Sequence, residues 1–399
     1  IIITFLLDFF KEILFINIIK TAVPPEFEEL YDKASYLKSQ TYLKENTKLS
    51  LFQSTVSTLI IIPFILFGGF NTLDIWARSF NLSEIMTGNL YVIILFILVT
   101  LSSLPFNLYK IFVIEEKYDF NRMTIKTFVE DIFKTILISL ILIVILFSAI
   151  QFIFIKTESN AWIYAWLSIV IFQIILSFIA PTVIMPLFNK FEPLESSPTK
   201  DKIETYLKKE NFKLKGLFKA DGSKRSNKAN AFFTGIGKSK RVVLYDTLLN
   251  NHTADELLSI VAHEVGHYKH HHIPKQMLKS CIQTGIMLKV LSMIISSPLI
   301  YNVFKIESPS IYLGFLVFGL LYTPINTILS IISNKVSRTF EYQADRYAVK
   351  TTKSKEHMIT ALKKLSVDTL SNLTPHPLKV FLDYSHPPIL KRIKAINKS

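Results

Sequence analysis

Cysteine is almost absent from this chain: Cys281 is the single cysteine in 399 residues. One thiol cannot form an intrachain disulfide, and it excludes every metal site built from several cysteine ligands. We interpret Cys281 as a packing residue. An initial methionine is also missing, because Ile1 stands first, so we expect an incomplete or processed N-terminus. We see no cleavable signal peptide.

Long polar segments are scarce as well, since half of the residues are hydrophobic. Apolar runs of about 20 residues are typical of membrane-spanning helices. Such runs occur near residues 52–71, 89–113, 133–155, 162–188, 277–304 and 311–333. Residues 1–19 form a weaker candidate, a truncated or interfacial helix, because Asp8, Lys11 and Glu12 interrupt them. We predict a mainly α-helical integral membrane protein with seven transmembrane helices.

Three residues disturb these apolar runs. Pro181 and Pro186 lie in the run 162–188, and we expect them to kink or end that helix near Asn189. Lys289 lies inside the run 277–304. A lysine within a membrane is a functional candidate, and it could face a water-filled space. A small helix offset or snorkelling towards the interface would explain it equally well.

The basic residues, which give a net charge of +14, are unevenly placed. Lys and Arg are abundant in four segments: 20–50, 114–134, 190–275 and 334–399. The intervening loops have Arg78, Lys156 and Lys305 as their main cations. This alternation follows the positive-inside rule for seven spans with the N-terminus outside, and it puts the basic segments in the cytoplasm. The charge therefore reflects membrane topology, and we expect no nucleic-acid partner.

The most informative motif is His-Glu-x-x-His, formed by His263, Glu264 and His267. On a helix the two histidines lie one turn apart on the same face, so both imidazoles can bind one Zn²⁺. Glu264 can reach the open side of the metal and accept a proton from the attacking water. A chance match of five residues is the alternative interpretation.

The flanking residues predict that this motif lies on a stable helix. Thr253 and Glu256 form a capping box at its start. An apolar stripe at helical spacing buries the opposite face. Its members are Leu257, Leu258, Val261 and Val265.

The polar segment before this helix contains further predicted elements. Residues 200–210 favour a helix, and residues 213–219 favour a short strand. Residues 229–235 and 240–245 favour two strands joined by Gly-Ile-Gly. In a metalloprotease, such an edge strand can pair with an extended substrate backbone.

A third protein ligand is needed, because catalytic zinc sites commonly have three and keep one position open. Glu341 and Asp345 are candidates one helical turn apart, just after the last apolar run. Glu341 could bind the metal while Asp345 accepts a hydrogen bond from a ligand histidine. An exposed acidic pair among basic residues explains the spacing equally well.

Several motifs together resemble the CAAX prenyl protease 1 family of integral-membrane zinc metallopeptidases, of the M48 type. They are His263 to His267, Phe340 to Asp345, Tyr384 to Pro388, Met185 to Phe191, Gly235 to Asp246 and Phe120 to Thr124. They occur in the family's order from about residue 24 to residue 393, so the resemblance covers nearly the whole chain.

The resemblance implies seven helices around an intramembrane chamber and a small α+β, gluzincin-like protease domain. It implies that His263, His267 and Glu341 bind one zinc ion per chain and that Glu264 is the general base. Asn230 and His386 match positions expected to stabilise the oxyanion. Without the resemblance, they would be interpreted as a strand-edge asparagine and a loop histidine.

Arg392 and Asp345 complete the expected site from outside the ligand set, with Arg392 orienting His386 or a backbone carbonyl. Two departures from the family stand out. Asp119 replaces a usual glycine, which puts the backbone conformation of that loop in doubt, and the first helix is short and charged. His270, His271 and His272 could form a second metal site, but we interpret them as the polar C-terminal end of the motif helix.

We therefore divide the chain into residues 1–189 with helices 1–5, the protease part 190–276, helices 6–7 in 277–333, and a C-terminal part 334–399 that completes the zinc site. The expected function is a zinc endopeptidase that cleaves near substrate C-termini, as the family does when it removes the last three residues of prenylated CAAX proteins. A heat-shock-type quality-control metalloprotease is the alternative, and a non-enzymatic scaffold or transporter is a third hypothesis.

We expect a peptide or protein substrate, prenylated or not, a surrounding lipid bilayer and a monomer. The membrane would be a bacterial inner membrane or the endoplasmic reticulum, depending on the source, with the site on the cytoplasmic side.

Overall fold

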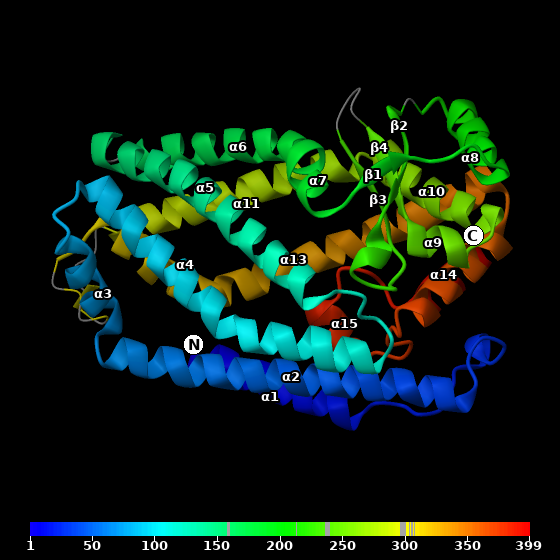
Figure 1. Cartoon of the computed structure of the whole chain (residues 1–399), viewed down its shortest axis with the longest axis horizontal. Coiled ribbons are helices and arrows are strands. Elements are labelled where there is room, and N and C mark those ends of the chain that lie inside the picture. The colour runs from blue at the N-terminus through cyan, green and yellow to red at the C-terminus, as the bar shows by residue number, and fades with distance from the viewer. Residues whose placement is uncertain are drawn as a thin grey trace.

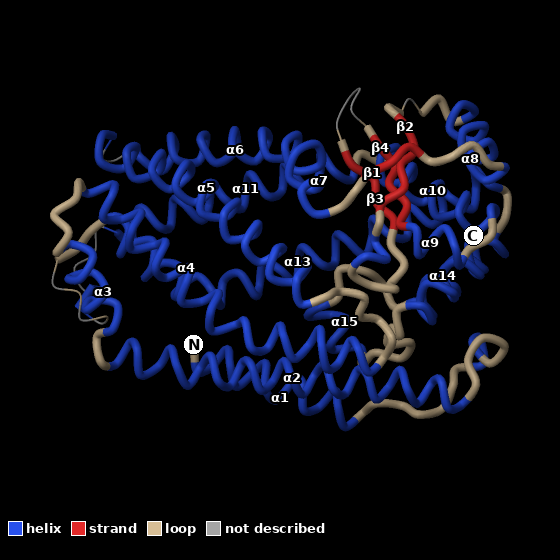
Figure 2. The backbone as a smooth tube through the Cα atoms, viewed as in Figure 1, coloured by secondary structure: helices blue, strands red, loops and turns tan. Residues whose placement is uncertain are grey.

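The computed structural model describes residues 1–157, 160–212, 214–235, 240–295, 301, 302, 304, 306 and 308–399. Helices dominate, and a small sheet lies towards one end of the molecule (Figure 1; Figure 2). The helices are α1 (Ile2–Asn17), α2 (Lys33–Leu66), α3 (Gly69–Arg78), α4 (Glu84–Tyr109), α5 (Ile125–Thr157), α6 (Ala161–Ile179), α7 (Met185–Phe188), α8 (Pro198–Lys209), α9 (Asp246–Asn251), α10 (Ala254–Lys269), α11 (His272–Ile295), α13 (Ile311–Thr352), α14 (Lys355–Asp368), α15 (Pro377–Asp383) and α16 (Ile389–Lys398). The strands are β1 (Phe191–Pro193), β2 (Gly216–Ala220), β3 (Ala231–Thr234) and β4 (Arg241–Tyr245).

Six helices in the described part of the chain are long and apolar enough to cross a membrane. They are α2, α4 continued to Glu115, α5, α6 continued to Phe188, α11 and α13. In each, at most 17% of the most apolar stretch is buried inside the protein. Lipid is the natural cover for such apolar surface. The predicted fold class, a mainly helical multi-pass membrane protein, is confirmed.

The predicted seventh span is α1, which has 16 residues. Its charged residues face α15, near the other end of the chain. The Lys11 ammonium lies 3.1 Å from Asp383, and Glu12 forms an ion pair with Lys379. Lys11 and Glu12 therefore have partners 372 and 367 residues away in the sequence, whereas Asp8 pairs with Lys11.

The prolines act as predicted at the end of α6. The helix widens into a π-helical turn at Ala180–Ile184, which contains Pro181, and α7 ends at Phe188. A proline cannot donate the regular helical hydrogen bond, so the ladder shifts register there. Asn189 is extended and leads into β1. A second π-helical turn, Lys110–Glu115, follows α4.

The sheet has the order β1-β2-β4-β3. β3 and β4 are antiparallel, as the predicted hairpin requires, and β2 runs parallel to β4. The strand predicted near residues 213–219 is observed as β2, and the helix predicted at 200–210 as α8. β3 lies at one edge of the described sheet, so one side of its backbone has no strand partner there.

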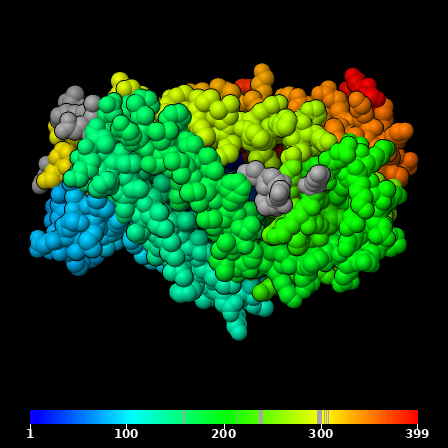
Figure 3. Space-filling model, turned by 90° about the horizontal axis from the view of Figure 1, so that it is seen from above, coloured from blue at the N-terminus to red at the C-terminus, as the bar shows by residue number. Residues whose placement is uncertain are grey.

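The sheet gathers with α8, α9, α10 and α14 at one end of the molecule, while α3 lies at the opposite end (Figure 1). Seen from above, the surface is hollowed between α11, in yellow-green, and the neighbouring green segment (Figure 3). The protease elements thus sit at the end of the helical part that carries the basic segments. The enclosed chamber implied by the family resemblance stays a prediction.

Two residues that the sequence singled out have clear environments. The ammonium of Lys289 lies 5.1 Å from the ring centroid of Trp162, which gives this exposed lysine a cation–π partner on α6. Asp119 has a φ of 63°, in the left-handed region where glycine is favoured. The loop backbone at Asp119 therefore has a conformation that glycine adopts more readily than aspartate.

Candidate active site

The helix α10 begins at the predicted capping box. The Thr253 backbone N–H donates to Glu256 Oε2 at 2.8 Å, and the Glu256 N–H donates to Thr253 Oγ1 at 3.3 Å. Lys364 of α14 adds a hydrogen bond to the same carboxylate. These bonds fix where the helix starts, and hence which face carries His263 and His267. The opposite stripe packs in the protein core, with Leu257, Val261 and Val265 buried.

Close packing of α10 on α13 brings the acidic motif to the histidines. Gly266 lies at the contact, where a Cβ would sit 3.0 Å from the Cα of Ala344 and 3.1 Å from the Cβ of Tyr347. Only glycine permits this approach without a shift of one helix. Glu341 therefore faces His263 and His267 directly. The alternative interpretation, an exposed acidic pair, is wrong because Glu341 and Asp345 are both buried.

Ligand-type atoms of His263, His267 and Glu341 converge within 4.8 Å of one another. The two Nε2 atoms are 3.1 Å apart. Glu341 Oε1 lies 3.4 Å from His267 Nε2, and Glu341 Oε2 lies 3.5 Å from His263 Nε2. Glu341 Oε2 is buried and has no hydrogen-bond partner among the described residues. A buried, unpaired carboxylate oxygen that faces two imidazoles fits a bound metal ion.

The charge of the site also fits a cation. Glu264, Glu341 and Asp345 place three carboxyl groups near the one guanidinium of Arg392. Burial lowers the pKa of His263, but the carboxylates of Asp345 and Glu341 outweigh burial and raise the pKa to about 9. The group thus favours positive charge at its centre, which a divalent ion supplies.

Asp345 and Arg392 stand behind the ligand group. His263 Nδ1 lies 2.9 Å from Asp345 Oδ1. Arg392 donates to both oxygens of Asp345 at 2.8 and 2.5 Å, and its Nη1 lies 3.4 Å from Glu341. The partners of Arg392 are therefore carboxylates, whereas the sequence suggested His386 or a backbone carbonyl. Arg392 and Asp345 are 47 residues apart, so the sequence alone did not reveal this bidentate pair.

Glu264 borders a cavity of about 180 Å³ that His263 and Glu341 of the ligand group also line. Asn230, His386 and Arg392 line the same cavity, and apolar side chains of α14 complete its wall. Burial raises the pKa of the Glu264 carboxyl, although the nearby histidines oppose this shift. A carboxylate with a raised pKa is a better proton acceptor, which suits a general base.

The structure brings Asn230 and His386 to this cavity from distant parts of the chain. Asn230 precedes the edge strand β3, and its Oδ1 accepts the N–H of Ala231 at 2.9 Å. The amide NH₂ is thus the group that can donate to a substrate. His386 Nε2 lies 3.3 Å from Glu341 Oε1, and its Nδ1 lies 3.0 Å from Ser385 Oγ.

His272 is a site neighbour that the sequence interpretation missed. His270 does end α10, and His271 is exposed, but His272 is only 1% exposed. Its Nδ1 lies 3.0 Å from His267 Nδ1. The prediction of a polar helix end is therefore wrong for His272. The run of three histidines directly after the motif was the one signal in the sequence.

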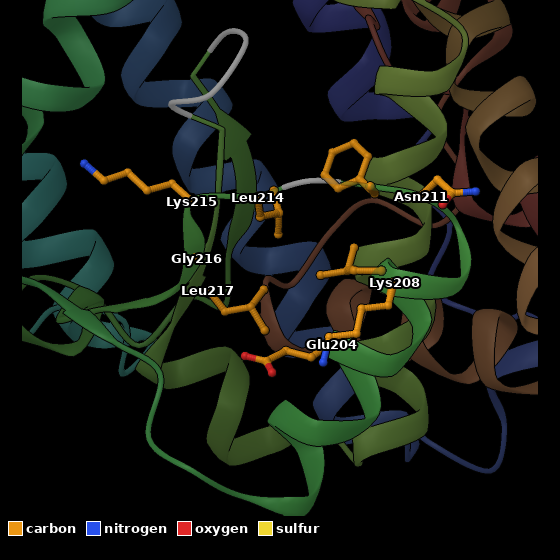
Figure 4. Close-up of a pocket in the computed structure, with 9 residues that line it drawn as sticks. Glu204, Lys208, Asn211, Leu214, Lys215, Gly216 and Leu217 are labelled. Carbon is orange, nitrogen blue, oxygen red and sulfur yellow. The ribbon is translucent and has the colours of Figure 1, made fainter.

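Larger hollows lie elsewhere and lack such chemistry. One of about 620 Å³ lies between α8 and β2 (Figure 4). Of the described residues that line it, Glu204 is the single carboxylate, and none is a histidine or cysteine. Metal-type ligands converge only at the cavity beside Glu264, within the part of the chain that the structure describes.

Comparisons with known proteins agree with this geometry. The family model described as CAAX prenyl protease N-terminal, five membrane helices, matches residues 12–190, and the model of peptidase family M48 matches residues 193–399. CAAX prenyl protease 1 of Saccharomyces cerevisiae is 32% identical over 95% of this chain and 89% of that protein. The CAAX prenyl protease 1 homolog of Homo sapiens is 30% identical over 94% of this chain and 89% of that protein. The crystal structure of S. mikatae Ste24p has a TM-score of 0.94 at 31% identity and covers 99% of this chain and 97% of that chain.

Proposed function

This chain belongs to the CAAX prenyl protease group of peptidase family M48, and from this premise we propose that it cleaves prenylated CAAX proteins near their C-termini. It is an integral-membrane metalloprotease of the CAAX type. The observation that carries the proposal is the convergence of His263, His267 and Glu341, next to a cavity that Glu264 lines together with His263 and Glu341.

We propose zinc as the metal, with His263, His267 and Glu341 as its ligands. Two imidazoles and one carboxylate are a common donor set of catalytic zinc, and they leave a position open for the reacting groups. When bound, the metal acts as a Lewis acid on the scissile carbonyl and on the attacking water. Asp345 holds His263 from behind through Nδ1, which directs Nε2 to the centre of the group.

Glu264 is the proposed general base. It lines the cavity next to the ligand group, and burial raises its pKa. In the reaction its carboxylate accepts a proton from the attacking water and then delivers that proton to the leaving amine. Removing the carboxylate while keeping the shape of the side chain should therefore stop turnover and leave metal binding intact.

Asn230 and His386 are the proposed oxyanion donors. Both line the cavity, and each has a nitrogen that can donate into it. A donor aimed at the negative charge that develops on the carbonyl oxygen lowers the barrier of the reaction. His386 is exposed, with a side-chain exposure of 68%, so substrate can reach it.

The edge strand β3 is the proposed docking element for the substrate backbone. Its outer side has no strand partner in the described sheet, and Asn230 directly precedes it. An extended peptide added to β3 would gain backbone hydrogen bonds and pass the ligand group. The apolar wall made by Met358, Leu362 and Leu365 suits aliphatic substrate side chains.

We further propose that the site faces the cytoplasm and that the chain acts as a monomer. The basic segments and the sheet lie at the same end of the molecule, as the positive-inside rule requires (Figure 1). All proposed ligands come from one chain, so no partner copy is needed to complete the site.

The test uses detergent-purified wild type beside Glu264→Gln, with Glu195→Gln as the matched control because Glu195 is exposed. The substrates are a farnesylated CAAX peptide, its unprenylated twin and an unfolded membrane protein. We expect wild type, Glu264→Gln and Glu195→Gln each to bind one zinc per chain. We expect wild type and Glu195→Gln to cleave the farnesylated peptide. We expect turnover to fall by about 10²–10⁴-fold only in Glu264→Gln.

Chelation should abolish cleavage, and added zinc should restore it. Equal cleavage of the peptide with and without farnesyl would remove prenylation from the proposal. Preferred cleavage of the unfolded protein would favour the quality-control alternative. A folded wild type that binds no zinc would overturn the proposed metal centre.

A further inference from the structure

His272 lies beside the ligand group because the chain has a break between two helices. α10 ends at Lys269, and His271 adopts a left-handed φ of 54°. α11 then starts at His272, whose ring is buried. This break is why two neighbours in one histidine run have opposite environments: His271 is exposed and His272 is not.

The ring of His272 is held on both faces. It stacks on Phe340 with ring centroids 4.0 Å apart and an interplanar angle of 8°. On the other face lies His270, with centroids 5.5 Å apart and an angle of 14°. These contacts leave the ring little freedom to rotate, so its two nitrogens point at defined partners.

Each nitrogen of His272 has one such partner. Nε2 lies 2.8 Å from Gln343 Oε1, and Nδ1 lies 3.0 Å from His267 Nδ1. A carbonyl oxygen only accepts, so the N–H of a neutral His272 is on Nε2 and its Nδ1 is an acceptor. The proton between the two Nδ1 atoms then belongs to His267, and His267 Nε2 presents its lone pair to the ligand group.

The reverse arrangement is incompatible with metal binding. If the NH₂ of Gln343 faced His272, the N–H of His272 would move to Nδ1 and His267 would carry its proton on Nε2. That proton would block the nitrogen that faces Glu341 and His263. The order Gln343 to His272 to His267 therefore fixes which tautomer of His267 is present.

The two histidines of the ligand group thus have unlike support. His263 contacts Asp345, which is paired with Arg392. His267 contacts the imidazole of His272, which in turn contacts the amide of Gln343. A carboxylate behind His267 would add a further acidic group to a site where Glu264, Glu341 and Asp345 already lie near a single guanidinium. An uncharged relay orients the ligand without that cost.

We propose that His272, together with Gln343, is a positioning residue that sets the tautomer and direction of His267 as a metal ligand. This rests on the proposed function, in which His267 binds zinc. Outer partners of ligand histidines commonly change metal affinity by about 10–100-fold. His272 therefore acts through His267 and touches neither substrate nor metal.

The test measures zinc affinity by competition with a chromophoric chelator on the detergent-purified full chain. His272→Phe keeps the stack on Phe340 and removes both nitrogens, and His272→Asn returns an acceptor oxygen near the Nδ1 position. Gln343→Leu removes the far acceptor. His271→Asn is the matched control, because His271 is exposed and asparagine tolerates its positive φ.

We expect zinc binding to weaken about 10–100-fold in His272→Phe, to recover part of that loss in His272→Asn, and to stay unchanged in His271→Asn. The double variant His272→Phe with Gln343→Leu should bind no more weakly than His272→Phe, since Gln343 acts through His272. The turnover number should fall with zinc occupancy while KM of the loaded enzyme stays constant.

Wild-type affinity in His272→Phe would overturn the proposal, and so would equal losses in the Phe and Asn variants, which a packing role predicts. Folding of His272→Phe is judged by its thermal unfolding without metal. If this variant does not fold, the zinc affinities of Gln343→Leu and His272→Asn test the proposal instead. A wild type that binds no zinc contradicts the proposed function itself, so the two failures are distinguishable.

Discussion

Asp119 has a backbone conformation that a residue with a Cβ adopts only with strain. Its φ of 63° belongs to a region where residues with a Cβ are strained. The loop is held from outside, because the Asp119 carbonyl accepts the Asn227 amide and the Asp119 carboxylate pairs with Lys38 at 3.0 Å. That ion pair is exposed and contributes little.

We therefore expect Asp119→Gly to stabilise the protein by up to about 1 kcal/mol, because glycine adopts this φ without strain. Asp119→Ala should destabilise it, since alanine adopts the left-handed region less readily than aspartate does. Thermal unfolding in detergent measures both. A lower melting temperature for Asp119→Gly than for wild type would show that the carboxylate, not the backbone, decides stability here.

Glu256 gives the start of α10 a pH dependence. Burial raises the pKa of this carboxyl, but hydrogen bonds from Lys364 and from the Thr253 backbone outweigh burial and lower it. A folded-state pKa below the unfolded value means that the ionised group stabilises the fold above the unfolded pKa. That contribution is lost as the pH falls through the folded-state pKa.

Glu256→Gln should therefore remove part of the acid sensitivity of the fold. The amide keeps a cap on the Thr253 N–H but carries no charge. We expect wild type to be more stable than the variant at neutral pH, and the gap to close as the solution is acidified. Melting temperatures of both proteins across that range measure the gap, and a constant gap would contradict the assignment.

At the scale of elements, the contact between α10 and α13 decides whether the site forms. A Cβ at Gly266 would press on backbone atoms of Ala344, which have no room to rotate away. We expect Gly266→Ala to push the helices apart by a few tenths of an ångström and to weaken zinc binding, even though alanine favours a helix.

The control for this substitution is Gly319→Ala in α13, where an added Cβ meets nothing within 4 Å. It should leave zinc affinity unchanged and raise helix stability slightly. Zinc affinity of both variants, measured as for the His272 series, provides the comparison. Unchanged affinity in Gly266→Ala would mean that the site tolerates a wider helix spacing.

The elements also show what sequence could and could not predict. The motif helix follows from local signals alone: a capping box, an apolar stripe and two histidines one turn apart. The third ligand needed the family resemblance, because spacing could not separate Glu341 from an exposed acid. His272 was missed because a left-handed residue, His271, separates α10 from α11, and a run of polar residues does not reveal that break.

At the scale of the molecule, the same limit applies to α1. Its charges look unfavourable in a membrane segment until α15 is placed beside it, with Asp383 and Lys379 as partners. The predicted spans rest on length and composition, which are local. Six of the seven predicted spans agree with the six long apolar helices of the described chain, and α1 is not among these six. Pairing between distant segments requires the fold.

The topology itself is testable with the one native thiol removed. In a Cys281→Ser background, Ser196→Cys marks the sheet end and Ser79→Cys marks the α3 end, and both positions are exposed. In sealed membrane vesicles whose cytoplasmic face is outward, we expect a membrane-impermeant maleimide to label position 196, and position 79 only after the vesicles are permeabilised. The opposite pattern would reverse the proposed orientation.

The position of the site along the chain has a consequence for biosynthesis. Glu341, His386 and Arg392 come 74 or more residues after His267, since 341 − 267 = 74. The ribosome must therefore make α11 and most of α13 before the proposed ligand group can close. The proposed protease is thus inactive while these membrane helices are still being synthesised.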